Sequence, residues 1–148
     1  MIPLNLPAFK YNVKNKDGKV SIFDIIRRKY IVLTPEEWVR QHFIHFMITH
    51  LTYPRALIKV ESGHRYNTLK KRSDIIVYSR QGTPWLVIEC KAPDQAVNDR
   101  TIRQVSVYNV SIKAPFVAMT NGLTHICCAI DGATGAASVM DRFPAYGV

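Results

Sequence analysis

Hydrophobic positions along the chain predict two amphipathic helices separated by strands. The segment 33–37 (Leu-Thr-Pro-Glu-Glu) is a typical helix start, because Thr34 can cap the helix and Pro35 suits its first position. Glu37 follows the cap by three residues, as in a capping box. Apolar residues then recur with helical spacing to about His50, and we expect one helix there and a second from 101 to about 112.

Runs of β-branched and aromatic residues predict strands between and after these helices. The expected strands are 56–61, 73–78, 85–91, 116–120 and 125–130, with an edge strand near 137–140. Residues 20–23 fit either a short strand or the lead-in to 24–28. The order helix, three strands, helix, two strands predicts an α/β (α+β) fold class, in which helices pack on a mixed β-sheet.

The length fits one domain over residues 1–148, in which 1–18 is an extended N-terminal arm with a turn at 16–18. With 47% hydrophobic residues the composition is globular, which excludes a mainly disordered chain. No apolar run approaches the roughly 18–20 residues of a membrane span, and the N-terminus lacks the basic region of a signal peptide. The three cysteines form no disulfide framework, so we expect a cytoplasmic protein.

The charge balance narrows the choice of partners. Twenty Lys and Arg against eleven Asp and Glu give a net charge of +9. A small basic domain of this kind favours a polyanionic partner, either nucleic acid or an anionic membrane surface. No amphipathic helix with a basic face stands out, so we favour nucleic acid.

Two carboxylates and an amine are predicted to meet at one end of the sheet. If the hairpin turns symmetrically about Gln81 and Gly82, paired residues have numbers that sum to 163, and Asp74 lies directly opposite Glu89. Lys91 follows Glu89 by two residues and therefore emerges on the same face. A one-residue bulge would break this register.

Like charges that lie directly opposite in a sheet are unfavourable. A shared proton, the Lys91 amine or a divalent cation would each relieve the Asp74–Glu89 repulsion. Mg²⁺ prefers carboxylate oxygens, and it activates water and polarises phosphodiester oxygens. The alternative to a functional site is that both acids are solvated at strand ends and that lysine forms an ordinary ion pair with one of them.

These residues resemble a known family. Asp74, fourteen intervening residues and Glu89-Cys90-Lys91 look like the D-x(n)-(D/E)-x-K motif of the PD-(D/E)xK nuclease superfamily. Further blocks, in order, resemble the N-terminal nuclease domain of type I restriction enzyme R subunits. They are 22–28, 33–41, 72–74, 89–93, 104–109 and 120–122, and the resemblance covers roughly residues 4 to 130. It implies a restriction-endonuclease-like mixed sheet flanked by helices.

The resemblance also implies roles for individual residues. Asp74 and Glu89 would bind Mg²⁺ or Mn²⁺, with the Cys90 carbonyl as a third ligand and Lys91 as the catalytic lysine. Gln104 and Tyr108 fit the Q-x-x-x-Y helix motif of RecB-like nucleases, where an i, i+4 pair faces one way. Their alternative is helix packing with a hydrogen bond.

Two further acids are candidate metal ligands with structural alternatives. Glu37 matches an acid on the first helix of some superfamily members, and it fits a capping-box glutamate equally well. Glu61 lies at the end of its strand, where a solvated carboxylate is the competing interpretation.

Basic side chains near the predicted site are candidate nucleic-acid contacts. They are Lys70, Lys71, Arg72, Arg100 and Arg103. Contacts of this kind grip phosphates and carry little sequence information, so we expect salt-sensitive, non-specific binding to DNA.

The sequence thus predicts a metal-dependent deoxyribonuclease related to restriction-modification enzymes. The alternative is a non-cleaving module with a nuclease-like fold that binds nucleic acid or a protein. These residues contain no G-x-x-x-x-G-K-(S/T) loop, so we expect no ATP site in this chain. Translocation would then be absent or supplied by a separate motor or specificity subunit, and a homodimer is a further candidate assembly.

Overall fold

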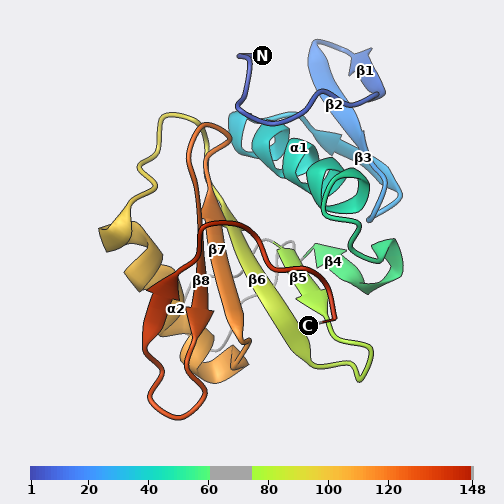
Figure 1. Cartoon of the computed structure of the whole chain (residues 1–148). Coiled ribbons are helices and arrows are strands. Elements are labelled where there is room, and N and C mark those ends of the chain that lie inside the picture. Colours follow the sequence, from blue (N-terminus) through green and yellow to red (C-terminus); the bar gives the residue numbers. More distant parts are fainter. Residues whose placement is uncertain (61–74, 148) are drawn as a thin grey trace.

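The computed structural model describes residues 1–60 and 75–147, and within α2 it leaves the side chains of Tyr108 and Ser111 undescribed. Figure 1 shows the elements in chain order. They are β1 (Val13–Lys16), β2 (Lys19–Asp24), β3 (Lys29–Val32), α1 (Pro35–Thr49), the 3₁₀ helix η1 (Arg55–Leu57), β4 (Ile58–Val60), β5 (Ile75–Tyr78), β6 (Pro84–Cys90), α2 (Asp99–Ile112), β7 (Phe116–Thr120), β8 (His125–Ile130) and β9 (Ala137–Val139).

The N-terminal segment forms a three-stranded antiparallel sheet, β1-β2-β3. The β1–β2 turn places Asp17 and Gly18 at positive φ, as tight hairpins require. The sequence had indicated an extended segment with a turn at 16–18, and it left 20–23 open between a short strand and the lead-in to 24–28, of which the strand is correct. It did not reveal that Val13 pairs with Ile22, or that 29–32 forms a third strand. Short polar strands such as β1 carry little periodic signal, and their pairing is set by the neighbouring strand.

The main sheet has six strands in the order β4-β5-β6-β7-β8-β9. All neighbours are antiparallel except β6 and β7, which run parallel. Parallel neighbours need a crossover, and α2 provides it. The predicted mixed sheet with helices packed on it is therefore confirmed.

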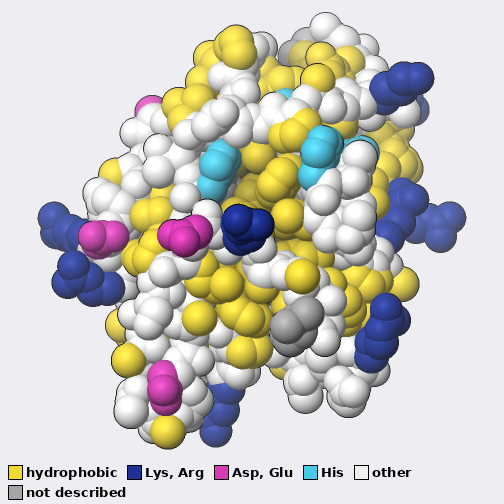
Figure 2. Space-filling model, viewed as in Figure 1, with side chains coloured by type: hydrophobic (Ala, Val, Ile, Leu, Met, Phe, Trp, Pro, Cys, Tyr) yellow, Lys and Arg dark blue, Asp and Glu magenta, His cyan; other side chains and the backbone are white. Residues whose placement is uncertain are grey.

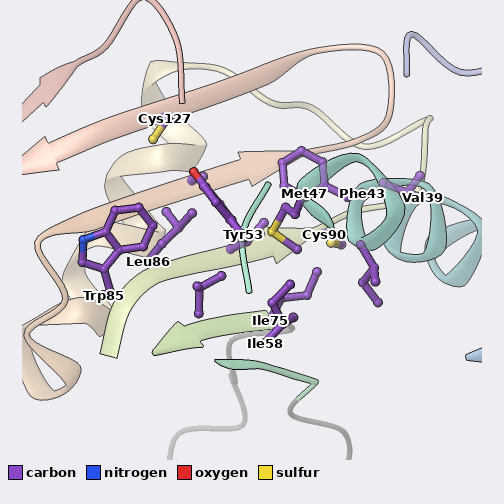
Figure 3. Close-up of a cluster of buried hydrophobic side chains, with 14 residues drawn as sticks. Val39, Phe43, Met47, Tyr53, Ile58, Ile75, Trp85, Leu86, Cys90 and Cys127 are labelled. Carbon is purple, nitrogen blue, oxygen red and sulfur yellow. The ribbon is translucent and has the colours of Figure 1, made fainter. Parts of the chain in front are cut away.

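Helix α1 packs on one face of this sheet. Its buried Val39, Phe43 and Met47 contact alternate residues of the strands, among them Leu86 and Ile88 (Figure 3). Because strand side chains alternate between faces, residues 86, 88 and 90 of β6 all point toward α1. Cys90 is 1% exposed, so its side chain is packed in this cluster.

Helix α2 covers the opposite face. Its Ile102 and Val105 pack against Val117, Met119 and Cys128 of β7 and β8. The helix begins two residues before the predicted start, because Asn98 and Thr101 form a reciprocal capping box there. The two faces of β6 thus have different environments, an apolar one under α1 and the start of α2 on the other side.

The first residues of the chain are tied to the rest of the molecule. The Trp38 Nε1 donates to the Ile2 carbonyl at 2.9 Å, and the Asn5 amide donates to the Gly122 carbonyl at 2.7 Å. The His125 Nε2 lies 3.0 Å from the Asn5 carbonyl. These bonds fix the arm against α1 and against the turn between β7 and β8.

Other predicted boundaries agree closely with the structure. Strands β7 and β8 and the start of α1 lie where the sequence placed them. Strand β4 is shorter than 56–61 because residues 55–57 form η1, and Glu61 lies outside the described residues. No helix in the described ranges is both long enough and apolar enough to cross a membrane.

Candidate functional site

The hairpin between β5 and β6 has the register that the sequence predicted. Ile75 pairs with Ile88, Ile76 with Val87 and Val77 with Leu86, so each pair sums to 163. The register shifts only beyond Val77, next to the turn, where Tyr78 pairs with Pro84. The predicted partner of Glu89 is Asp74, which lies outside the described residues.

Glu89 and Lys91 emerge on the α2 side of the sheet. They alternate with Cys90, whose side chain points the other way into the core under α1. Glu89 Oε2 lies 3.8 Å from Lys91 Nζ, and the side chains are 12% and 31% exposed, respectively. The carboxylate is thus largely shielded from water, while the amine reaches the surface.

The two side chains line a pocket of about 210 Å³ between the end of β6 and the first turns of α2. Its walls are Glu89, Lys91, Gln95, Ala96, Thr101, Gln104, Val105 and Met119. Thr101, Gln104 and Val105 lie one turn apart on a single face of α2. Val105 and Met119, which are largely buried, add apolar side chains to this lining beside its polar groups.

Gln104 is therefore in the same pocket as Glu89 and Lys91. The sequence had linked these residues through the family resemblance, and the capping box at Asn98 explains how the helix presents Gln104. The side chain of Tyr108, four residues further along, lies outside the described atoms.

The loop from β6 to α2 is held by the end of β7. The Lys91 amide donates to the Thr120 carbonyl at 2.8 Å, which continues the parallel pairing by one residue. Asn121 Nδ2 donates to the Gln95 carbonyl at 2.7 Å, and its Oδ1 accepts from the Leu123 and Thr124 amides. The sequence did not single out Gln95 or Thr101 as members of this site, since no local pattern indicates which loop or helix lies next to Glu89.

Glu37 lies in a different environment. Its Oε1 accepts from Arg40 Nη1 at 2.6 Å, and its Oε2 accepts from Arg27 Nη2 at 2.7 Å and Gln41 Nε2 at 2.8 Å. Arg27 also pairs with the fully buried Asp24 at 2.6 Å. Glu37 is on α1 and is not among the residues that line the Glu89 pocket. Both of its oxygens are engaged by cationic or amide donors, an arrangement that stabilises the contact between α1 and β2.

The basic candidates divide into two groups. Arg100 and Arg103 are exposed in the first turns of α2, beside the pocket, and Arg103 Nε donates to the Asp99 carbonyl at 3.2 Å. Lys70, Lys71 and Arg72 lie outside the described residues.

The pocket offers the kind of donors that a hard divalent cation takes. The Glu89 carboxylate and the Gln104 amide carry oxygen atoms, which Mg²⁺ and Mn²⁺ prefer, whereas the Thr101 hydroxyl is engaged in the capping box with Asn98. Within residues 1–60 and 75–147, no three His, Cys, Asp or Glu side chains gather as a metal cluster. Two of the predicted ligands, Asp74 and Glu61, lie outside those ranges. The described donors fit a partly built carboxylate site.

Comparison with known proteins identifies the family. A family model described as "Type I restriction enzyme R protein N terminus (HSDR_N)" matches residues 35–144, which is more than half of the chain. The chain belongs to this family. The match begins at the first residue of α1 and includes the pocket of Glu89, Lys91 and Gln104.

A solved structure shows a weaker likeness. It is a fragment assigned as an HsdR subunit of a type I restriction enzyme from Vibrio vulnificus YJ016, 25% identical in sequence with a TM-score of 0.37. The match covers 59% of this chain and 16% of that one, so this chain corresponds to a small part of the longer protein. No curated protein matches the chain.

Proposed function

We propose that this chain is a Mg²⁺- or Mn²⁺-dependent nuclease that hydrolyses phosphodiester bonds of DNA. The observation that carries the proposal is that Glu89, Lys91 and Gln104 line one pocket, with carboxylate and amine 3.8 Å apart. Membership of the type I restriction R protein family supports it. The net charge of +9 supports a polyanionic substrate.

The proposed roles follow from the chemistry of each group. Glu89 would hold the divalent cation together with Asp74 and the Cys90 carbonyl. When bound, such a cation polarises a phosphodiester oxygen and lowers the pKa of the attacking water. The PD-(D/E)xK assignment belongs to this proposal, because it requires Asp74 opposite Glu89.

Lys91 would stabilise the reacting phosphate. The Lys91 side chain is 31% exposed and lines the pocket, so its ammonium can approach a phosphate oxygen that gains negative charge. In hydrolysis the water oxygen bonds to phosphorus, one P–O ester bond breaks, and the leaving oxygen takes a proton. Gln104 would orient the water or a phosphate oxygen through its amide.

Arg100 and Arg103 would hold the flanking DNA backbone. Both are exposed on the turn of α2 next to the pocket. Lys70, Lys71 and Arg72 remain proposed contacts of the same kind. Restriction in cells would further require a motor or specificity subunit, or a homodimer to cut both strands.

The test is cleavage of supercoiled plasmid and linear DNA by the purified chain in Mg²⁺, Mn²⁺ or EDTA. We expect metal-dependent cleavage that is lost in Asp74→Ala and Lys91→Ala and kept in Lys59→Ala, whose side chain is exposed on β4. Cleavage that persists in both site variants would reject the proposed site. Tight, salt-sensitive binding without turnover in any metal would instead favour the non-cleaving module.

A further inference from the structure

The small sheet β1-β2-β3 has one face that packs on the molecule and one that faces away. Cross-strand partners share a face, so the inner face is marked by Ile22 and Asp24, both 0% exposed. The opposite face carries three lysines and two aromatic rings. They are Lys14, Lys16, Lys19, Phe23 and Tyr30, which we call the outer face of the small sheet.

The three lysines form a concentrated positive patch. Lys16 and Lys19 are direct cross-strand partners, and Lys14 lies two residues from Lys16, about 6.6 Å along the strand. All three are exposed, and none forms an ion pair with any acid in the described part of the chain. Like charges directly opposite are unfavourable in a sheet, so a polyanion that covers this face relieves a repulsion already present.

Basic side chains are visible at this margin of the molecule. In Figure 2, several Lys and Arg side chains project from the edge at which Figure 1 places β1–β3. The small sheet lies beside α1, whereas the Glu89 pocket lies on the α2 face of the main sheet. The outer face therefore uses side chains that are separate from the proposed catalytic ones.

The aromatic rings add a second kind of contact. Phe23 and Tyr30 are cross-strand partners with ring centroids 5.2 Å apart, and both are half-buried. The Lys14 ammonium lies over the Tyr30 ring, 4.2 Å from its centroid. A lysine stem is flexible, so a flat base can replace the ammonium over the ring while the ammonium moves to a phosphate.

We propose that the outer face of the small sheet binds single-stranded nucleic acid, with its lysines on the phosphates and Tyr30 stacked on a base. An exposed basic surface with aromatic rings is what single strands require, because stacking is open only to unpaired bases. The inference goes beyond the proposed hydrolysis and does not depend on it. Lysines on an edge strand also discourage aggregation. If that were their whole role, Tyr30 would not stack on bases and removing the lysines would cause no specific loss of nucleic-acid binding.

The test is fluorescence anisotropy of the full chain in EDTA with labelled oligo-dT, oligo-rU and duplex DNA of about 15 nucleotides. The variant Lys14→Gln/Lys16→Gln/Lys19→Gln is compared with Lys59→Gln/Lys113→Gln/Arg142→Gln, whose side chains are exposed elsewhere. Each triple removes three charges, which takes the net charge from +9 to +6. The equal change in net charge isolates the effect of position.

For the outer-face triple we expect the slope of log K against log salt to fall by about 2, at about 0.7 per lost phosphate contact, and by clearly less for the control. Tyr30→Leu should weaken binding to the single strands about tenfold and leave the duplex nearly unchanged. The two single-stranded probes distinguish DNA from RNA. Circular dichroism and thermal melting verify that the variants fold.

Equal affinities and salt slopes for the two triples would overturn the inference, as would unchanged single-strand binding in Tyr30→Leu. Because no metal is present, a failure of cleavage does not affect this result. A chain that binds through the outer face but never cuts would reject only the proposed function. A chain that cuts but binds equally in both triples would reject only the outer-face site.

Discussion

Lys91 Nζ lies 3.8 Å from Glu89 Oε2 on the face of β6 opposite the Cys90 thiol. The separation is longer than a hydrogen bond, so the two groups attract without closing on each other. Lys91 keeps 31% of its side chain exposed, and the Glu89 side chain keeps 12%. This ion pair by itself should therefore contribute little to the free energy of unfolding.

This geometry predicts that a substitution of Glu89 abolishes activity and changes stability little. Glu89→Gln keeps the shape and removes the charge, so we expect DNA cleavage to be lost while the free energy of unfolding changes by less than about 1 kcal/mol. Lys91→Ala should lower the cleavage rate by about 10²–10³-fold. The measurements are plasmid cleavage and urea unfolding. If Glu89→Gln instead unfolds the protein and Lys91→Ala cuts normally, the pair is structural.

A second prediction concerns the ion-pair network between β2 and α1. Arg27 bridges Asp24 and Glu37, with N–O distances of 2.6 and 2.7 Å, and all three are largely buried. Arg27→Ala leaves two carboxylates without their shared cation, so we expect a loss of about 3–5 kcal/mol in urea unfolding. Lys29→Ala, an exposed neighbour, should change stability by less than about 0.5 kcal/mol. A similar effect for both variants would mean that the network is not coupled to folding.

A third prediction is a loss of stability at low pH in two steps. Burial lowers the pKa of His42, His45 and His125 below the usual 6.5, so their contribution declines as pH falls below that value. Burial alone would raise the pKa of Asp24, but hydrogen bonds from Arg27 and Gln41 outweigh it and hold that pKa below 3.8. Its contribution is complete above the unfolded value and is lost as pH falls through the folded one.

The check is urea unfolding over a pH series from about 7.5 to about 3. Asp24→Asn should remove the acidic step and keep the histidine step. A flat profile between about pH 7.5 and 4 would contradict the buried neutral histidines.

A fourth prediction uses two glycines with the same backbone conformation. Gly82 and Gly122 both have φ of +85°. A Cβ on Gly122 would lie 2.8 Å from Leu4 Cδ2, whereas a Cβ on Gly82 meets nothing within 4 Å. Gly82→Ala should cost about 1 kcal/mol for the left-handed conformation, and Gly122→Ala should cost more because the arm is also displaced. The double variant with Leu4→Ala should recover the crowding part in thermal melting; no recovery would show that crowding is absent.

A fifth prediction concerns the thiols. Cys90, Cys127 and Cys128 are at most 4% exposed, and burial raises the pKa of Cys127 to about 12. We expect negligible reaction with a thiol reagent at about pH 8 in the folded protein and reaction of all three after denaturation. The number of modified thiols, read by mass spectrometry, checks this. Rapid labelling of the native chain would show that the core on at least one face of the sheet opens, under α1 for Cys90 and Cys127 or under α2 for Cys128.

The elements that the sequence predicted well are those set by local signals. Thr34 accepts from the Glu37 amide at 3.0 Å, as the cap position predicts. A turn centred on Gln81 and Gly82 predicted the register of 75–77 with 86–88, which the structure has, although the register shifts next to the turn. The partners of the Glu37 side chain could not be predicted from local signals. The spacing suggested a cap or a metal ligand, but Arg27, ten residues earlier in the chain, engages the carboxylate.

In the candidate site, too, local features were predicted from the sequence and contacts between distant residues were not. Glu89 and Lys91 were predicted to share a face because alternation along a strand is local. The loop that carries Gln95 is held in part by the Asn121 bond to its carbonyl, between residues 26 positions apart. The roles of Asp74 and Tyr108 stay predictions, since Asp74 and the Tyr108 side chain lie outside the described part of the molecule.

The Arg27 ion pairs limit how far the chain can be shortened from its N-terminal side. The family match begins at Pro35, so a fragment that starts there corresponds to the shared region. Such a fragment would lack Arg27, and Glu37 would lose one of its two arginine partners. It would also lose the Ile2 carbonyl that accepts from the Trp38 indole. The segment before Pro35 therefore holds α1 in place through these bonds. Expression trials of the minimal domain should include this segment and should not begin at Pro35, where the family match begins.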